Sequence, residues 1–134
     1  MADTFQLEIV TPEKLVVDDR AEEMQIPARN GYLGVLPGHA PLITELAVGE
    51  ISYRRGGTTE RLAVAWGFAE VLPEKVTILA QTAESADEID VARAERAQER
   101  AQKRLNSGDA ATDFPRAQTA LARAQARLEV AGKR

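Results

Sequence analysis

Five arginines in the last third of the chain have the spacing of residues that share a helix face: Arg93, Arg100, Arg116, Arg123 and Arg127. Separations of four and seven positions return to the same side of a helix. Guanidinium groups on two adjacent helices could therefore bind a polyphosphate through paired hydrogen bonds. The alternative is a solvated face, on which Glu95 or Glu99 pairs with neighbouring arginines, and this is the commoner arrangement of charged helix surfaces.

The other reactive residue types indicate neither catalysis nor a metal centre. The chain has a single histidine and no cysteine, which excludes a thiolate site and a site built from several histidines. His39, between Gly38 and Ala40, is predicted to be a structural residue of a loop. Neither a nucleophile elbow nor a Gly-rich phosphate loop with its Lys-Ser/Thr ending is present. We therefore predict no catalytic residue and no metal ligand.

Composition and charge narrow the class of protein further. The 134 residues are 44% hydrophobic and 28% charged, with a net charge of −4, which is typical of one folded globular domain or of a small domain with an appendage. The positive charge in the C-terminal third is small, and no aromatic residues are interleaved with it, so nucleic acid is not an expected partner. The start MADTFQLEIV has neither the basic nor the apolar region of a signal peptide, and no run is long enough to span a membrane.

Short alternating apolar runs predict strands through about the first 80 residues. Phe5, Leu7 and Ile9 alternate with polar residues, and similar runs recur between Gly- and Pro-containing turns up to Leu79. Many short strands at close spacing predict an antiparallel sandwich or barrel. Trp66 is expected, with Phe68, to fill the core or the edge of this sheet structure.

The stretch from Gly31 to Thr44, GYLGVLPGHAPLIT, is predicted to be a shaped loop. Glycines allow positive φ, and prolines fix φ and remove amide donors, which argues against a helix or an interior strand. Its apolar residues could pack into the chain's own core or bind a partner. The residues alone favour packing on the chain's own domain.

Near Ser85 the hydrophobic period changes from that of a strand to that of a helix. Ser85 and Glu88 form a capping-box pattern, which predicts a helix from there to about Leu105, ended by Gly108. A second helix is predicted from Asp113 to about Val130. Alanine stripes on both helices predict a closely packed antiparallel hairpin, loosely attached to the sandwich. We therefore divide the chain into a sandwich domain, 1–84, and a hairpin, 85–134.

Ordered motifs across nearly the whole chain resemble one protein family. The segments are GYLGVLPGHAPLIT at 31–44, LAVGEI at 46–51, GFAEV at 67–71 and VTILA at 76–80, before the capped, alanine-rich helices. They resemble the epsilon subunit of F-type ATP synthase, and LPGHAPL at 36–42 is the most specific of them.

The resemblance implies a flattened antiparallel β-sandwich of about ten strands, followed by the antiparallel αα-hairpin. It implies binding to the gamma subunit and the c-ring, and contact of the extended hairpin with the catalytic alpha and beta subunits. No cofactor is required in such a subunit. The implied location is peripheral, on the cytoplasmic side of a bacterial cell membrane, and reached only through the complex.

A nucleotide site is implied by the same resemblance. IDVARA at 89–94 is similar to the family motif Ile/Leu-Asp-x-x-Arg-Ala. The residues that the motif implies at ATP, with three arginines near the phosphates, are Glu84, Ile89, Asp90, Arg93, Ala94, Arg100, Arg123 and Arg127. ATP is therefore expected as a regulatory ligand and not as a substrate.

An interface with the neighbouring subunits is implied for the stretch that begins at Gly31. Its residues are Gly31, Tyr32, Leu33, Gly38, His39, Ala40 and Pro41. Two residues depart from the family pattern. Trp66 stands where a second glycine usually precedes Gly67, so the backbone or a neighbouring contact must differ there. Tyr32 stands where a carboxylate is frequent, which argues against a charged contact with the ring at that position.

These expectations lead to one main functional hypothesis. The chain is expected to be a non-catalytic rotor subunit that couples proton flow to ATP synthesis and whose mobile hairpin restrains ATP hydrolysis. The alternative is a free-standing β-sandwich binding module with a helical tail. An enzyme is a weak third hypothesis, because no paired base and nucleophile is visible.

Overall fold

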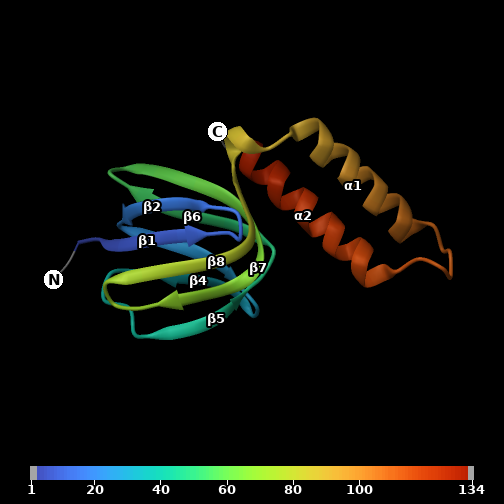
Figure 1. Cartoon of the computed structure of the whole chain (residues 1–134). Coiled ribbons are helices and arrows are strands. Elements are labelled where there is room, and N and C mark those ends of the chain that lie inside the picture. Colours follow the sequence, from blue (N-terminus) through green and yellow to red (C-terminus); the bar gives the residue numbers. More distant parts are fainter. Residues whose placement is uncertain (1–2, 133–134) are drawn as a thin grey trace.

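Eight strands and two helices follow one another in the computed structural model, which describes residues 3–132 (Figure 1). The strands are β1 (Phe5–Val10), β2 (Leu15–Ala21), β3 (Glu23–Ala28), β4 (Gly31–Val35), β5 (Leu42–Leu46), β6 (Gly49–Arg55), β7 (Thr58–Val71) and β8 (Lys75–Ser85). A 3₁₀ turn, η1 (Ala86–Glu88), leads to α1 (Val91–Asn106) and α2 (Phe114–Gly132). The predicted β-sandwich followed by a helical hairpin is thereby confirmed.

The strands form two layers that share their two longest members. One layer runs β2-β1-β8-β7-β5, and the other runs β4-β3-β6-β7-β8. Because β7 and β8 pass through both layers, each layer contains five strand segments. The two layers together thus hold the ten strand segments expected, built from eight continuous strands in the described chain. The expectation of an antiparallel sheet needs one correction, since β1 pairs with β8 in parallel.

A change of direction in β7 carries the chain from one layer to the other. Its inward side chains are Leu62 and Val64 in the first half and Ala69 and Val71 in the second. Five positions separate Val64 from Ala69, whereas a regular strand keeps its inward residues two positions apart. The extra position lies at Trp66 and Gly67, whose positive φ values of 49° and 125° interrupt the regular alternation of the strand.

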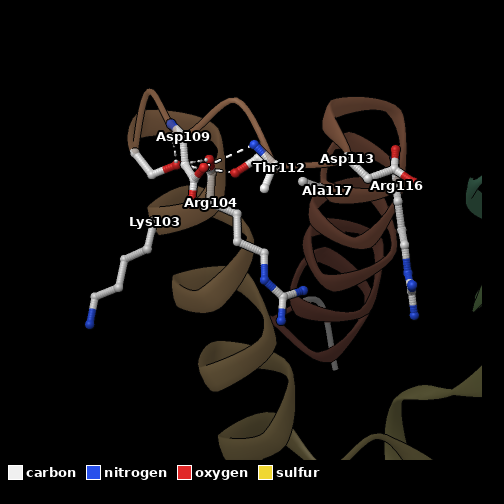
Figure 2. A pocket seen from close by; sticks show the side chains of 9 residues that line it. Lys103, Arg104, Asp109, Thr112, Asp113, Arg116 and Ala117 are labelled. Atoms are coloured by element: carbon white, nitrogen blue, oxygen red, sulfur yellow. Dashed lines mark hydrogen bonds between the residues drawn. The ribbon is translucent and has the colours of Figure 1, made fainter.

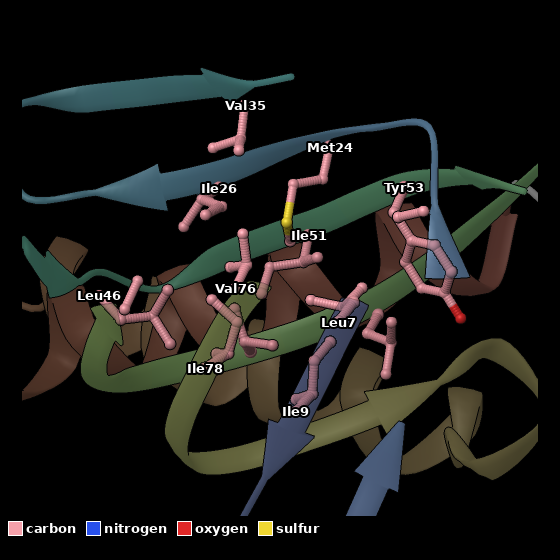
Figure 3. Close-up of a cluster of buried hydrophobic side chains, with 14 of the residues drawn as sticks. Leu7, Ile9, Met24, Ile26, Val35, Leu46, Ile51, Tyr53, Val76 and Ile78 are labelled. Atoms are coloured by element: carbon pink, nitrogen blue, oxygen red, sulfur yellow. The ribbon is translucent and has the colours of Figure 1, made fainter. Parts of the chain in front are cut away.

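The space between the layers is filled by one hydrophobic core. Figure 3 shows side chains of β1, β3, β6 and β8 converging there, among them Leu7, Ile9, Met24, Ile51 and Ile78. Tyr53 lies at the edge of this core and donates a hydrogen bond to Asp19 over 3.3 Å. Burial, followed by the nearby Asp19 charge, raises the pKa of Tyr53 to about 12, and the hydroxyl therefore stays protonated.

The stretch 31–44 is not one shaped loop, as predicted, but two strands joined by a turn. β4 and the start of β5 flank the turn 36–41. Gly34 and Pro37 do not prevent this. Among residues 3–132, β4 is an edge strand that pairs only with β3, and Pro37 lies outside both strands. The Gly38 amide donates to the Pro73 carbonyl at 2.8 Å, which ties this turn to the turn between β7 and β8.

The capping signals are confirmed, although one of them caps a different element. Ser85 and Glu88 form the predicted capping box, but on η1, and the α-helix begins later with Asp90 as its N-cap. Gly108 has the predicted left-handed conformation, with φ 66°, just after α1. The Asp113 carboxylate accepts a hydrogen bond from the Arg116 amide at the start of α2.

The hairpin meets the sandwich through α2, while α1 lies on the far side of α2 (Figure 1). A small apolar cluster joins the two parts, formed by Ala63 of β7, Ile89, and Ala126 and Val130 of α2. Between the helices the buried residues are alanines, with Ala94 and Ala101 facing Ala117 and Ala124. The attachment to the sandwich thus buries few large side chains, in line with the predicted loose attachment.

We predict that Gly67→Ala destabilises the fold strongly. A Cβ atom at Gly67 would stand 1.8 Å from the Leu79 carbonyl oxygen, and the φ of 125° already disfavours a side chain. The expected loss in the free energy of unfolding is about 3 kcal/mol. Urea denaturation of the full chain measures it.

Gly56→Ala is the matched control for this substitution. Gly56 also has a positive φ, 57°, but a Cβ atom there would meet no atom within 4 Å. The control should lose only about 1 kcal/mol, the usual cost of a left-handed residue with a side chain. Equal losses at the two positions would show that the close approach of β7 to β8 does not require glycine.

Candidate functional site

A cleft between the two helices and the end of β8 collects most of the residues predicted at the nucleotide. It has a volume of about 250 Å³ and is lined by Glu84, Glu88, Asp90, Arg93, Ala94, Ala97, Arg100 and Arg127. Six of the eight predicted residues are in this set. The structure thus brings Arg93 and Arg100 of α1 and Arg127 of α2 around one space, as their spacing suggested. Whether a ligand binds there stays a prediction.

The carboxylates of this cleft already have partners in the described chain. Glu84 accepts from Arg127 Nε at 2.7 Å, and the Asp90 side chain accepts from the Arg93 amide at 3.1 Å. Glu88 accepts from Ser85 and from Lys14 Nζ, and the Ser85 amide, followed by Lys14, holds the pKa of Glu88 below its ordinary value. Glu88 therefore stays charged and engaged at neutral pH.

Two arginines of the cleft keep their donors available. Within residues 3–132, the guanidinium groups of Arg93 and Arg100 form no hydrogen bond or ion pair, whereas the nearby carboxylates are engaged. Each guanidinium offers a planar set of N–H donors that matches two oxygens of a phosphate group. The cleft is thus suited to an anion, and its volume encloses only part of a nucleotide.

Two predicted nucleotide residues lie elsewhere. The Ile89 side chain is buried in the apolar cluster under α2 and does not line the cleft. Arg123 lies over the ring of Trp66, with its Cζ 4.3 Å from the ring centroid. A side chain stacked on the sandwich in this way is not directed to the cleft. The motif could not indicate this, because the partner Trp66 is far away in the sequence.

The fifth arginine of the spacing pattern, Arg116, lies at the other end of the hairpin. A larger hollow of about 570 Å³ lies there, between the end of α1 and the start of α2, lined also by Lys103, Arg104 and Asp113 (Figure 2). Figure 2 shows the three basic side chains pointing in different directions, and the two carboxylates near the turn, Asp109 and Asp113, accept backbone hydrogen bonds. This hollow lacks the converging donors of the first cleft.

The predicted interface residues do not gather at one point. Gly31, Tyr32 and Leu33 begin β4, whereas the turn with His39 follows its other end, about 13 Å away for a five-residue strand. Tyr32 is exposed, and its hydroxyl accepts a hydrogen bond from the Glu50 amide at 3.2 Å. His39 Nδ1 lies 2.7 Å from the carbonyl oxygen of Ala40, a local contact that agrees with a structural role.

An exposed apolar row on the outer face of the β2-β1-β8-β7-β5 layer was missed by the sequence reasoning. Its members are Leu15, Leu79, Phe68 and Ile43, each between 53% and 70% exposed. Phe68 pairs directly with Leu79, and Leu79 with Val10, which pairs with Leu15. Phe68 was expected in the core or at an edge of the sheet, and this prediction is wrong. The change in which residues face inward at Trp66 turns the Phe68 side chain outward.

Comparison with known proteins identifies the family. The model of the ATP synthase delta/epsilon chain β-sandwich domain matches residues 4–86, and that of the delta/epsilon chain long α-helix domain matches residues 87–132. The chain belongs to the ATP synthase delta/epsilon family. It is 51% identical over 133 residues to the ATP synthase epsilon chain of Syntrophobacter fumaroxidans, with 99% of each chain covered. It is 70% identical over 107 residues to that of Koribacter versatilis, covering 80% of this chain and 75% of the relative.

A solved structure shares the fold of this epsilon-family chain. It is a chain of the Euglena gracilis mitochondrial ATP synthase, OSCP/F1/c-ring, in rotational state 1, with a TM-score of 0.83 and 25% sequence identity. The match covers 98% of this chain and 82% of that one. Epsilon chains are stalk subunits of the synthase rather than catalytic ones. Among the described residues, no helix is both long and apolar enough to cross a membrane, and no cluster of possible metal ligands is found.

The two departures from the family pattern have structural explanations. Trp66 keeps the backbone conformation that a glycine would adopt, with a positive φ of 49°, and places its ring under Arg123. Tyr32 uses its hydroxyl within the chain, at the Glu50 amide.

Proposed function

We propose that this chain is a rotor subunit of the central stalk of an F-type ATP synthase, where it links the gamma subunit to the c-ring and helps to couple proton flow to ATP synthesis. The observation that carries the proposal is the apolar row across four strands of one sheet face. Large contiguous apolar patches on a small protein mark a surface that a partner covers. The family membership makes an ATP synthase subunit that partner.

The apolar row fits the gamma subunit better than the ring. Leu15, Phe68, Leu79 and Ile43 form an exposed surface that an apolar partner would cover. The polar loops of the ring would instead meet the turn 36–41, where backbone groups and His39 are accessible. Through these contacts the chain would be held at the cytoplasmic side of a bacterial membrane without a membrane segment of its own. The free-standing module considered from the sequence gains no support from the structure.

We further propose that residues 1–84 are the part that docks and that the hairpin, 85–134, is a mobile regulator. Because the contact between α2 and the sandwich is small and rich in alanine, separating the hairpin from the sandwich requires little free energy. In the extended position the hairpin would reach the catalytic alpha and beta subunits and restrain ATP hydrolysis. ATP at Arg93, Arg100 and Arg127 would favour the docked position, because the cleft exists only there.

Phe68→Ser is predicted to weaken the binding of the gamma subunit about tenfold or more, since it removes a large side chain from the centre of the apolar row. Titration of the isolated gamma subunit with the chain measures the dissociation constant. Phe114→Ser, which changes an exposed phenylalanine on α2, is the matched control and should bind normally. Unchanged binding by Phe68→Ser would refute the assignment of this face.

Removal of residues 87–134 is predicted to leave assembly intact and to raise ATP hydrolysis by the complex. The sandwich keeps its own core and the apolar row without the hairpin. Hydrolysis by complexes purified with the full-length or the truncated chain gives the measurement. If the truncated chain assembles but hydrolysis is unchanged, the hairpin is not an inhibitor in this synthase.

Arg93→Gln and Arg100→Gln are each predicted to lower the affinity for ATP about tenfold, since each removes a charge-assisted pair of donors. Calorimetry of the full chain with ATP provides the measurement. Arg116→Gln, which lies at the other end of the hairpin, is the control and should leave the affinity unchanged. The absence of heat with the unsubstituted chain at millimolar ATP would reject the site.

A further inference from the structure

Trp66 is held in a backbone conformation that its side chain disfavours. With φ at 49°, it is the only residue other than glycine with a positive φ among residues 3–132. The left-handed region is unfavourable for a residue with a Cβ atom and a bulky ring. Such a residue persists where its surroundings compensate for the strain, and it often marks a position with a role of its own.

The ring of Trp66 makes a contact that a glycine could not make. Arg123 of α2 lies over it, with Cζ 4.3 Å from the ring centroid, within the range of a cation–π interaction. Trp66 belongs to the sandwich and Arg123 to the hairpin. The contact therefore joins the two parts of the chain and exists only while the hairpin is docked.

A second cation of α2 reaches the sandwich one helical turn later. Arg127 Nε donates to Glu84 Oε1 at 2.7 Å, and both side chains are about one-third exposed. Arg123 and Arg127 lie four positions apart and therefore share a helix face. Besides these contacts, docking rests on the small cluster of Ala63, Ile89, Ala126 and Val130, against which the partly buried Val48, Ala86 and Ala131 pack. With so little apolar burial, the two arginine contacts contribute a substantial share of the attachment.

The two arginines differ in their relation to the cleft. Glu84 and Arg127 both line it, so a bound anion can compete with Glu84 for Arg127. Arg123 does not line the cleft, and its partner Trp66 carries no charge that an anion could replace. The Trp66–Arg123 contact therefore forms without any ligand in the cleft, although Arg123 shares a small neighbouring hollow with Glu84 and Arg127.

We propose that Trp66 and Arg123 form a clamp that holds the hairpin on the sandwich in the absence of nucleotide. The inference rests on the proposed mobility of the hairpin and adds a contact that sets its resting position. In this chain Arg123 is a docking residue and not a phosphate ligand. The clamp raises the docked population at all ATP concentrations, and ATP adds to it through Arg93 and Arg100.

A buried reporter on α2 tests the clamp. Ala126 is 5% exposed beneath the docked hairpin, and the chain contains no cysteine, so Ala126→Cys introduces a single thiol that reacts when the hairpin separates. In this background, without nucleotide, Arg123→Gln should raise the rate of thiol labelling about threefold to tenfold, the loss expected for one cation–π contact. Arg123→Lys, which keeps the charge, should restore part of the protection.

Trp66→Gly shows whether the two residues act as a pair. The substitution removes the ring and also relieves the strain at φ 49°, and labelling should nevertheless become faster. The double variant with Arg123→Gln should label no faster than the faster single variant, because the same contact is lost. Multiplied effects would show that the two residues act independently and would overturn the clamp.

Arg116→Gln is the matched control, because Arg116 lies on the same helix but at the end of the hairpin that is distant from the sandwich. Arg116→Gln should leave the labelling rate unchanged. If it raised the rate as much as Arg123→Gln does, the increase would come from the loss of one positive charge and not from the loss of the contact with Trp66. Ala63→Cys, on the sandwich side of the same cluster, repeats the measurement if Ala126→Cys itself separates the hairpin. Labelling insensitive to Arg123→Gln from both reporters refutes the clamp.

The clamp and the proposed function can fail separately. If removal of residues 87–134 raises hydrolysis while the Trp66 and Arg123 variants label at the normal rate, the regulator stands and the clamp is refuted. If these variants label faster while the removal leaves hydrolysis unchanged, the clamp stands and the inhibitory role is refuted.

Discussion

The close approach of β7 to β8 at Gly67 is the constraint on which the rest of the structure depends. The Leu79 carbonyl lies where a Cβ atom of Gly67 would be, so the two strands can cross between layers together only with glycine at this point. The crossing changes which residues face inward, from Leu62 and Val64 to Ala69 and Val71. One local backbone feature thereby closes the sandwich and turns Phe68 to the surface, where it joins the apolar row.

The same bend links the sandwich to the hairpin. Trp66, next to Gly67, has the left-handed conformation that the crossing requires, and its ring meets Arg123 of α2. The hairpin is otherwise held by alanines and a few larger side chains, because small residues permit close helix packing but bury little surface. A weak attachment with a few specific contacts suits an element whose position is to be regulated.

Much of the fold could be predicted from local patterns. The alternation of Phe5, Leu7 and Ile9, the capping box at Ser85 and Gly108 after α1 depend on neighbours in sequence. The structure confirms all three, although the capping box precedes η1 and not α1. The stretch 31–44 was predicted wrongly, because an edge strand tolerates glycine once a neighbouring strand supplies its hydrogen bonds. The cleft was indicated by helical spacing, yet Ile89 and Arg123 point elsewhere, because each found a partner distant in sequence.

The sequence by itself determined the two parts of this protein, the capped alanine-rich helices and the family to which its motifs belong. These properties follow from residue periodicity, capping and glycine positions, which act over a few neighbouring residues. Only the tertiary structure decided that eight strands make two five-stranded layers, that Phe68 and Leu79 lie side by side on the surface, and that Arg123 stacks on Trp66. Each of these depends on contacts between segments far apart in the chain, which periodicity does not encode.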